Sequence, residues 1–506
     1  MSDIKNDKET TKRKQVTEPG RGVDVLKKTD VIVAGGGVGG FAAALAAARA
    51  GAQVTLVERN GCLGGILTSN IIPNLCNHHL DAESRHQVFG VARELIERLV
   101  AENGCVSRWE ERHAKIVFDE QRLKVVMIDM LREAGVQILT HCFAARPIME
   151  GSQVKGLFIE TKAGRRAILA DVVVDATGEA DIASQTGCPM RYTEGTATLA
   201  FKMSSVDMEA FVDYFAKHPN EFPGGFDSMH GFWDFELNFK EYGDFYFPNG
   251  GGRAWRVFQD AIASGEYSKT RGKIFGMDMS CLIGLRDLRD VSVNCLYWRL
   301  HSLEPDEVSE AELECQRAVY YVADFFHKYV PGFANAHVSQ ISQDIGIRIS
   351  RGIHGVETLT TEMVNSDKQL CFDTVVAVRS AVPHKFGAVD HPYENEPVWA
   401  AKPLPEKKLR FHHAHTVDIP FGVILPQDVD GLLMGSGKSV SCIPQYILRT
   451  GVESIMPGQA AGVAAAIASK QKLSPRELNV RDVQRELLNQ NVFLGPEERL
   501  RQLGLR

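Results

Sequence analysis

Residues 30–40 read Asp-Val-Ile-Val-Ala-Gly-Gly-Gly-Val-Gly-Gly, and this stretch decides the fold. Its β-branched run is typical of a strand buried on both faces. The glycines follow, and the alanine-rich residues 41–50 predict a helix. A second apolar run at residues 53–57 predicts a neighbouring strand that stops at Glu58. Together these features predict the strand–helix–strand unit that begins a doubly wound α/β sheet.

The pattern Gly35-x-Gly37-x-x-Gly40 lies between that strand and that helix, which is the context of a dinucleotide-binding turn. Gly35 permits a tight turn, Gly37 lets the backbone approach a diphosphate at the helix N-terminus, and Gly40 allows close helix packing. Glu58 stands where a carboxylate can accept hydrogen bonds from ribose hydroxyls. The unit predicts a dinucleotide site, although it does not by itself separate FAD from NAD.

Length and composition indicate an ordinary globular protein of more than one domain. The chain has 506 residues, 44% of them hydrophobic and 24% charged, so a single core is not expected. Its net charge of −7 argues against nonspecific binding to nucleic acid, which needs a basic surface. No apolar leader stands within residues 1–28, and the apolar stretch 31–50 is interrupted by glycines and Arg49. We therefore expect a protein without a membrane span.

The ten cysteines form no Cys-x-x-Cys pair, so the spacing of iron–sulfur and structural zinc sites is absent. Such scattered thiols fit a reducing compartment, and we expect a cytoplasmic protein. They are Cys62, Cys76, Cys105, Cys142, Cys188, Cys281, Cys295, Cys315, Cys371 and Cys442.

The order of patterns predicts a Rossmann-like α/β domain into which an α+β lobe is inserted. We expect a disordered lead-in at 1–28, the first part of the nucleotide-binding domain at 29–195, the inserted lobe at 196–341, the return to the first domain at 342–470, and a helical tail at 471–506.

Several individual elements are also predicted. They are a hairpin over Pro147–Ala170, a helix from a capping box at Ser309–Glu312 to Tyr329, a small-residue helix over Gly458–Ala468, and a tail helix with Asn479 as N-cap and Val480, Val483 and Leu487 on its buried face.

Three further segments favour FAD over NAD. Gly64-Gly65 offers bare backbone soon after Glu58, where a longer cofactor would extend. The strand 171–175 ends in the tight turn Ala176-Thr177-Gly178. The segment Arg449–Gly462 leads into the small-residue helix, whose N-terminus suits the electron-rich pyrimidine edge of a reduced flavin.

With these segments the chain resembles the FAD-dependent oxidoreductases with two dinucleotide-binding domains and, more distantly, the flavoprotein subunits of fumarate reductase and succinate dehydrogenase. The resemblance covers nearly the whole chain after Thr29. Its motifs are Gly35–Gly40, Glu58 with Gly64-Gly65, Phe118–Glu120, Asp175–Asp181, Gly346–Arg351, Asp418–Pro420 and Gly458–Gly462.

The resemblance implies a set of cofactor contacts along the chain. The diphosphate would lie on Gly35 to Gly40, the adenosine ribose on Glu58, and the flavin's pyrimidine end on the backbone N–H groups of Ser454 and Ile455. The full expected FAD-binding set is Gly35, Gly37, Val38, Gly39, Gly40, Glu58, Arg59, Gly64, Gly65, Ala176, Thr177, Gly178, Gly437, Ser454 and Ile455.

The sequence departs from these relatives at three places. Gly422 follows Phe421 where many relatives carry an arginine, and Gly437-Lys438 replaces a Gly-Arg pair, so a dicarboxylate substrate is put in doubt. No histidine stands at residues 65–68, where succinate dehydrogenase attaches its flavin, and we expect non-covalent FAD. His78 and His79 nevertheless lie close in sequence.

The expected catalytic candidates are Arg449, Arg351, His415 and His354. Arg449 would lie at the boundary between flavin and substrate. Arg348 and Arg351 would share a face if their stretch were helical, and either could orient an anion or simply form an interdomain ion pair. His412, His413 and His415 match no standard zinc spacing, so we expect no metal site and consider His415 an acid–base candidate.

We therefore expect an FAD-dependent dehydrogenase or reductase that moves a hydride between flavin N5 and a small organic substrate. A redox-neutral isomerase or hydratase and a flavin monooxygenase remain alternatives, although no second nucleotide motif for NAD(P)H stands in the chain. The expected partners are the substrate and an electron donor or acceptor that the sequence does not identify. A homo-oligomer is compatible with the sequence.

Overall fold

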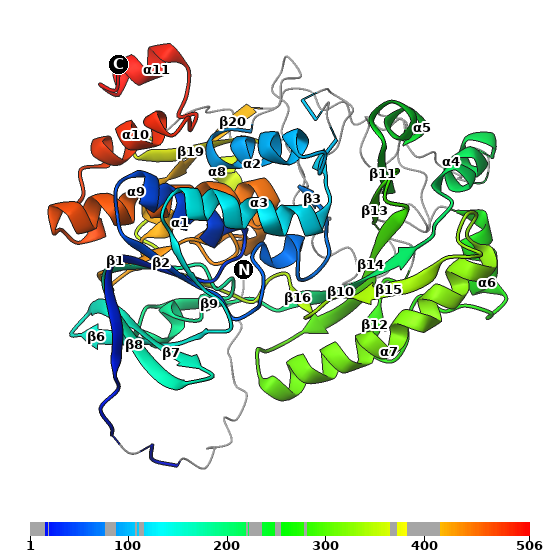
Figure 1. Cartoon of the computed structure of the whole chain (residues 1–506), viewed down its shortest axis with the longest axis horizontal. Helices are drawn as coiled ribbons and strands as arrows, with labels where there is room; N and C mark the ends of the chain where they lie inside the picture. The colour runs from blue at the N-terminus through cyan, green and yellow to red at the C-terminus, as the bar shows by residue number, and fades with distance from the viewer. Residues whose placement is uncertain are drawn as a thin grey trace.

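The computed structural model describes two large sheets of different kinds, four two-stranded sheets and the helices that cover them (Figure 1). It describes residues 16–18, 20–75, 88–106, 109–110, 116–218, 221, 235–247, 255–277, 281–364, 372–381 and 415–506.

The first sheet is built around the β-branched strand that the sequence predicts. Its order is β5 (Gln137–Leu139), β2 (Val54–Val57), β1 (Val25–Ala34), β8 (Gly164–Asp175), β7 (Gln153–Thr161) and β6 (Phe143–Glu150), and β21 (Leu432–Met434) also pairs with β8. The pairs among β5, β2, β1, β8 and β21 are parallel, whereas β6, β7 and β8 form an antiparallel meander. The predicted doubly wound sheet is confirmed.

Two predicted boundaries in this sheet are wrong. β1 begins at Val25, inside the stretch predicted as lead-in, because Val25 to Thr29 pair with the early part of the long strand β8. The hairpin predicted over 147–170 is part of a three-stranded meander, since β8 continues without a break from its hairpin half into its parallel half.

Helices α1 (Val38–Arg49) and α9 (Gly451–Gln471) lie side by side in Figure 1. Their backbones approach closely, because a Cβ at Gly458 would lie 2.2 Å from the carbonyl oxygen of Gly39 and one at Gly462 would lie 2.1 Å from that of Ala43. The small residues therefore serve helix packing. The helix predicted over 458–468 is confirmed, but it begins seven residues earlier, at Gly451.

Further helices surround this pair. α2 (Gly90–Ala101) and α3 (Glu120–Glu133) pack on one side, and α10 (Val480–Asn489) and α11 (Glu497–Gln502) follow α9. Asn479 caps α10, with its side chain accepting from the N–H of Arg481 (3.1 Å), and Val483 and Leu487 are buried as predicted.

The second sheet belongs to the inserted part of the chain and is antiparallel. Its strands are β11 (Asp244–Phe247), β13 (Leu282–Leu285), β14 (Asp290–Leu300), β10 (Gly195–Ser204) and β15 (His337–Ile341), with β12 (Ile274–Phe275) on β14 and β16 (Gly346–Ile347) on β10. We name residues 195–347 the second lobe. Because β16 pairs with β10, this lobe extends beyond the predicted boundary at residue 341.

One face of the second sheet is apolar and is covered by α7 (Pro305–Tyr329), with α4 (Met208–Lys217) and α6 (Arg256–Ala263) nearby. α7 begins at Pro305 rather than at the predicted capping box, because proline is favoured in the first helical turn and the helix continues through residues 309–312. The opposite face carries buried polar side chains, among them Thr198, Lys202, Ser292 and Asn294.

Short elements connect the two parts. The segments η1 (Gly65–Leu67), β3 (Asn74–Leu75) with β4 (Ile116–Val117), and β9 (Met190–Tyr192) with β17 (Arg351–Ile353) are among them. Other short elements pack on the core of the first part: β18 (Leu359–Thr360) with β22 (Cys442–Ile443), α8 (Thr361–Val364), β19 (Val375–Ala381) with β20 (His415–Pro420), and η8 (Gln445–Leu448). Val117 of β4, Tyr246 of β11, Ile283 of β13 and Cys281 just before β13 share a small buried apolar cluster.

Within the described residues no helix is long and apolar enough to cross a membrane. The same part of the chain contains no group of three or more histidine, cysteine, aspartate or glutamate side chains arranged to hold a metal ion.

Candidate functional site

The carboxyl ends of four parallel strands meet at one edge of the first sheet. Ala34 of β1 pairs with Val57 of β2 and with Asp175 of β8, and Asp175 also pairs with Met434 of β21. The segments that follow these strands therefore lie together: the glycine turn, Glu58, the turn 176–178 and residues 435–438. Ligands of open α/β sheets bind outside this edge.

The turn after β1 leaves no room for a side chain at its two ends. Gly35 has φ +101°, and a Cβ there would lie 2.4 Å from the carbonyl oxygen of Ala176. A Cβ at Gly40 would lie 1.8 Å from the carbonyl oxygen of Gly35. At Gly37, by contrast, φ is −65° and a Cβ would meet nothing within 4 Å. The space outside Gly37 is open to a ligand.

The N-terminus of α1 has the properties of an anion site. Gly37 is its N-cap residue, no side chain caps the helix, and no acidic residue stands in its first turn. The N–H groups of Val38 and Gly39 have no partner in the preceding turn, since intrahelical bonding begins with Phe41 N to Gly37 O (2.8 Å). These donors and the helix dipole favour a phosphate group.

Glu58 is held in place by backbone amides. Its Oε2 accepts from the N–H of Gly36 (2.6 Å) and its Oε1 from that of Asn60 (2.7 Å), and the residue is buried. A carboxylate has about four acceptor positions, so two further hydrogen bonds remain open to hydroxyl groups. The arrangement fits a ribose beside the diphosphate position.

Gly64-Gly65 lies directly against the first glycine turn. The N–H of Gly64 donates to Gly36 O (2.8 Å), and a Cβ at Gly65 would lie 3.1 Å from the Cα of Gly37. The structure thus brings together two glycine segments that the sequence separates by more than twenty residues.

The turn Ala176-Thr177-Gly178 is organised by Asp175, which belongs to the motif Asp175–Asp181 but was assigned no role from the sequence. Its carboxylate accepts from the Thr177 hydroxyl (2.7 Å) and from the N–H groups of Thr177 (3.1 Å), Ile182 (3.0 Å) and Ala183 (2.9 Å). Burial nevertheless raises the pKa of Asp175, and the hydrogen bonds only partly oppose that rise. An aspartate directly after the apolar run Val172-Val173-Val174 is the sequence signal that could have indicated this role.

Helix α9 starts at the same edge of the sheet. The Ser454 hydroxyl accepts from the N–H of Gly437 (3.1 Å), and a Cβ at Gly437 would lie 1.8 Å from the carbonyl oxygen of Leu448. Because α9 begins at Gly451, the N–H of Ser454 already donates to Thr450 O (2.7 Å). The prediction that Ser454 and Ile455 offer free N–H groups is therefore wrong. The first turn presents those of Gly451 and Val452 instead.

A family model described as FAD dependent oxidoreductase matches residues 30–487. The chain belongs to the FAD-dependent oxidoreductase family. FAD is accordingly its cofactor, and the open N-terminus of α1 with Glu58 beside it fits the ADP half of FAD. No curated protein matches the chain in sequence.

Solved structures with a similar arrangement include p-nitrophenol 4-monooxygenase from Pseudomonas putida, with 12% identity, 95% of this chain and 93% of that chain covered, and a TM-score of 0.41. Another is a geranylgeranyl bacteriochlorophyll reductase-like protein from Thermoplasma acidophilum, with 13% identity, 92% and 87% coverage, and a TM-score of 0.37.

The other predicted FAD-binding and catalytic residues lie in different surroundings. Arg449 follows η8 and lies two residues before α9, at the edge that carries the glycine turns. Arg59 forms an ion pair with Asp344 of the second lobe. The backbone of His354 bonds Pro189 O (2.9 Å) and the N–H of Gln427 (3.0 Å). His415 begins β20, and its side chain lies outside the described part, as do His78, His79, His412 and His413.

Arg351 belongs to a charged cluster at the end of β8. Its stretch is not helical, so the face predicted to be shared with Arg348 does not exist. Its guanidinium donates to the carbonyl oxygen of Glu179 (2.5 Å) and pairs with Asp181 (2.5 Å), while Lys438 pairs with Glu179. These contacts favour the ion-pair alternative for Arg351 over a role in substrate binding.

Asp181 gives the cluster a pH dependence. Burial and the neighbouring carboxylates Glu179 and Asp175 raise its pKa to about 6, against the effect of Arg351. The folded protein therefore binds this proton more readily than the unfolded chain. The resulting stability is complete below the ordinary carboxyl pKa of about 4 and is lost as pH rises through about 6.

We expect Asp181→Asn, which cannot ionise, to lack this dependence. Between about pH 5 and about pH 7.5, the unfolding free energy of the wild type should fall relative to the variant by about 1 kcal/mol, because solvent screening reduces the full effect at a side chain that is 36% exposed. Urea unfolding at both pH values measures this. An equal difference between the two proteins at both pH values would refute the assignment.

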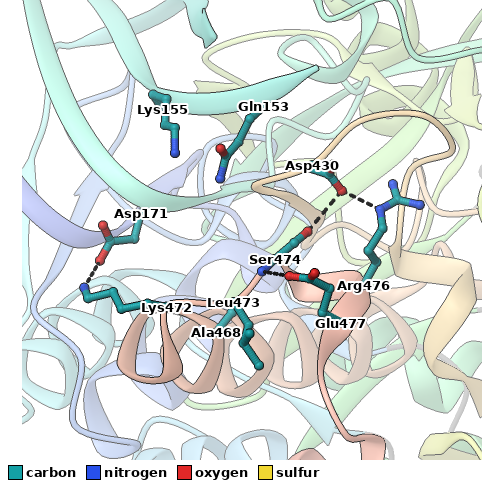
Figure 2. A pocket seen from close by; sticks show the side chains of 10 residues that line it. All are labelled: Gln153, Lys155, Asp171, Asp430, Ala468, Lys472, Leu473, Ser474, Arg476 and Glu477. Atoms are coloured by element: carbon teal, nitrogen blue, oxygen red, sulfur yellow. Dashed lines mark hydrogen bonds and ion pairs between the residues drawn. The ribbon is translucent and has the colours of Figure 1, made fainter. Parts of the chain in front are cut away.

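A cavity lies at the opposite edge of the first sheet (Figure 2). It measures about 430 Å³ and lies beside Asp171, Asp430 and the residues that follow α9. Its acids are already paired: Asp171 with Lys472 (2.7 Å), Asp430 with the hydroxyl of Ser474 (3.0 Å) and with Arg476, and Glu477 with the N–H of Ser474 (2.9 Å). Asp171 and Asp430 precede the ends of β8 and β21 that lead into the glycine turns, so this cavity is separate from the edge that fits FAD.

Proposed function

We propose that the protein is an FAD-dependent dehydrogenase or reductase that transfers a hydride between flavin N5 and a small organic substrate. The observation that carries the proposal is the edge of the first sheet, where the uncapped N-terminus of α1, the oriented carboxylate of Glu58 and the start of α9 converge. The polar face of the second lobe adds a surface for a substrate.

Each part of this edge has a binding task. The N–H groups at Gly37 to Gly39 hold the diphosphate, and Glu58 holds the ribose hydroxyls. When bound, FAD supplies the hydride-accepting or hydride-donating N5. Arg449 carries positive charge beside the start of α9, where the N–H groups of Gly451 and Val452 are donors, and these groups favour an anion on the ring or on the substrate.

The second lobe orients the substrate and excludes water. Thr198 and Asn294 lie on its buried polar face, opposite to the face that forms its apolar core, and Asn294 can both donate and accept a hydrogen bond. A positioned carbon beside the cofactor is what hydride transfer requires. The proposed cofactor binding is non-covalent, as the sequence predicts.

The test begins with protein reconstituted with FAD and kept without oxygen. We expect alcohols or saturated acids in a substrate panel to bleach the flavin absorbance, and an artificial electron acceptor to sustain repeated turnover. The proposal fails if turnover requires both NAD(P)H and oxygen, as in a monooxygenase, or converts substrate without net electron transfer, as in an isomerase or hydratase.

Arg449→Ala provides a local test with the substrate found by that panel. We expect a variant that retains FAD but loses about 100-fold in kcat/KM, which is the effect of removing a charged contact in a water-excluded site. The matched control is Arg317→Ala on α7, whose side chain is 71% exposed. Wild-type activity in Arg449→Ala would remove this arginine from the site.

A further inference from the structure

Ile71 has a backbone conformation that its side chain disfavours. Its φ is +46°, in the left-handed region, and the residue is fully buried. A β-branched residue with this φ is a genuine outlier, and such residues persist only where the surrounding structure imposes the conformation. Strained residues of this kind cluster at functional sites.

A residue of the second lobe holds this turn. The hydroxyl of Ser292, on β14, donates to the carbonyl oxygen of Ile71, and both residues are fully buried. Within the turn, the N–H of Ile71 donates to Thr68 O (3.3 Å) and that of Ile72 to Ile66 O (3.2 Å). The carbonyl of Ile71 thus depends on a donor from another part of the chain.

The two residues before Ile71 are tied to the same lobe. The side-chain N–H₂ of Asn70 donates to the backbone oxygen of Asp344 and approaches its Oδ1 (3.2 Å). The carbonyl oxygen of Ser69 accepts from the N–H of Gln343 (2.9 Å). Three consecutive residues, 69 to 71, therefore each bond the second lobe.

The segment of residues 66–75, which contains this turn, lies at the proposed FAD contacts at both of its ends. It begins just after Gly64-Gly65, which packs against Gly37. It ends at Leu75, whose side chain lies 2.8 Å from the Cβ position of Gly451, the first residue of α9. A change in the turn at Ile71 would be transmitted to both ends of the crevice.

We propose that Ser292 and Ile71 are positioning residues: the hydroxyl of the second lobe holds the strained turn so that Gly64-Gly65 and the start of α9 keep the spacing that FAD needs. This inference rests on the proposed FAD crevice. It predicts that FAD affinity depends on a hydroxyl in the second lobe.

The variants Ser292→Ala, Ser292→Thr and Ser204→Ala test this contact. Ser204 is the matched control, since its hydroxyl bonds Ser339 within the second lobe (2.6 Å). FAD is titrated into each apoprotein and its dissociation constant measured, with the visible flavin spectrum and the apoprotein Tm recorded beside it.

We expect Ser292→Ala to raise the FAD dissociation constant about tenfold, since it leaves a buried carbonyl without its donor, and to shift the flavin spectrum. Ser292→Thr, which keeps the hydroxyl, should restore both, and Ser204→Ala should change neither. Wild-type affinity and spectrum in Ser292→Ala would overturn the proposal. So would an equal loss of affinity in Ser204→Ala.

The strain is tested by the pair Ile71→Ala and Ile71→Gly, because both remove the side chain but only glycine accepts φ +46° freely. We expect the Tm of the glycine variant to equal or exceed that of the alanine variant. At Ile72, the neighbouring control, glycine should be the less stable of the two. The same order at Ile71 as at Ile72 would overturn the strain argument. If the wild type does not bind FAD, the proposed function fails. If the wild type binds FAD and Ser292→Ala binds it equally well, only this inference fails.

Discussion

Gly37→Ala should fold like the wild type and yet lose FAD. The Cβ meets no protein atom within 4 Å, and φ at −65° suits any residue, so the apoprotein Tm should change little. The added methyl group would stand where the backbone must approach the diphosphate. We expect the FAD dissociation constant to rise at least about 100-fold, equivalent to ~2.7 kcal/mol, as measured by titration of the apoprotein.

Gly40→Ala is the matched control, with the opposite expectation. Its Cβ would lie 1.8 Å from the carbonyl oxygen of Gly35, so this variant should fail at the level of folding. If Gly37→Ala binds FAD as tightly as the wild type, the diphosphate does not lie on the first turn of α1.

Arg499→Met should destabilise the protein strongly, although it lies in the C-terminal helix far along the chain. Its guanidinium makes two contacts to Asp418 (2.6 and 2.7 Å), and the two residues are 7% and 1% exposed. Removal of the arginine leaves a buried carboxylate without its counter-charge, for which we expect about 3–5 kcal/mol lost from the free energy of unfolding. Urea unfolding measures this loss.

Two further variants separate the buried pair from ordinary surface charge. Arg501→Met removes an arginine that is 69% exposed on the same helix and should cost less than about 1 kcal/mol. The double variant Arg499→Met with Asp418→Leu should regain at least about half of the lost stability, since it removes the uncompensated charge as well. Equal costs for Arg499→Met and Arg501→Met would show that the pair is not important to stability.

Much of the FAD-binding edge of the first sheet could be predicted, because the residues that form it lie close together in the sequence. The buried strand before Gly35, the glycine spacing and the acid at Glu58 are each specified within thirty residues, and the structure brings them together with Gly64-Gly65. The small residues of α9 likewise predicted a helix, although they did not reveal its close packing on α1.

The remaining features depend on contacts between distant segments, which periodicity does not report. The start of α9 could not be placed because residues 451–457 lack a helical pattern and contain Pro457. Arg351 could be read either as a ligand for an anion or as half of an ion pair, and only the fold brings Asp181 to it. The sequence does not indicate the strained turn at Ile71, because isoleucine is an ordinary core residue.

A crystal structure of the protein grown with FAD would locate the cofactor. We expect its diphosphate on the N–H groups of Val38 and Gly39, its adenosine ribose on Glu58, and its ring system at the first turn of α9 beside Arg449. A diphosphate bound elsewhere, or a ring system away from α9, would contradict the assignment of this edge as the active site.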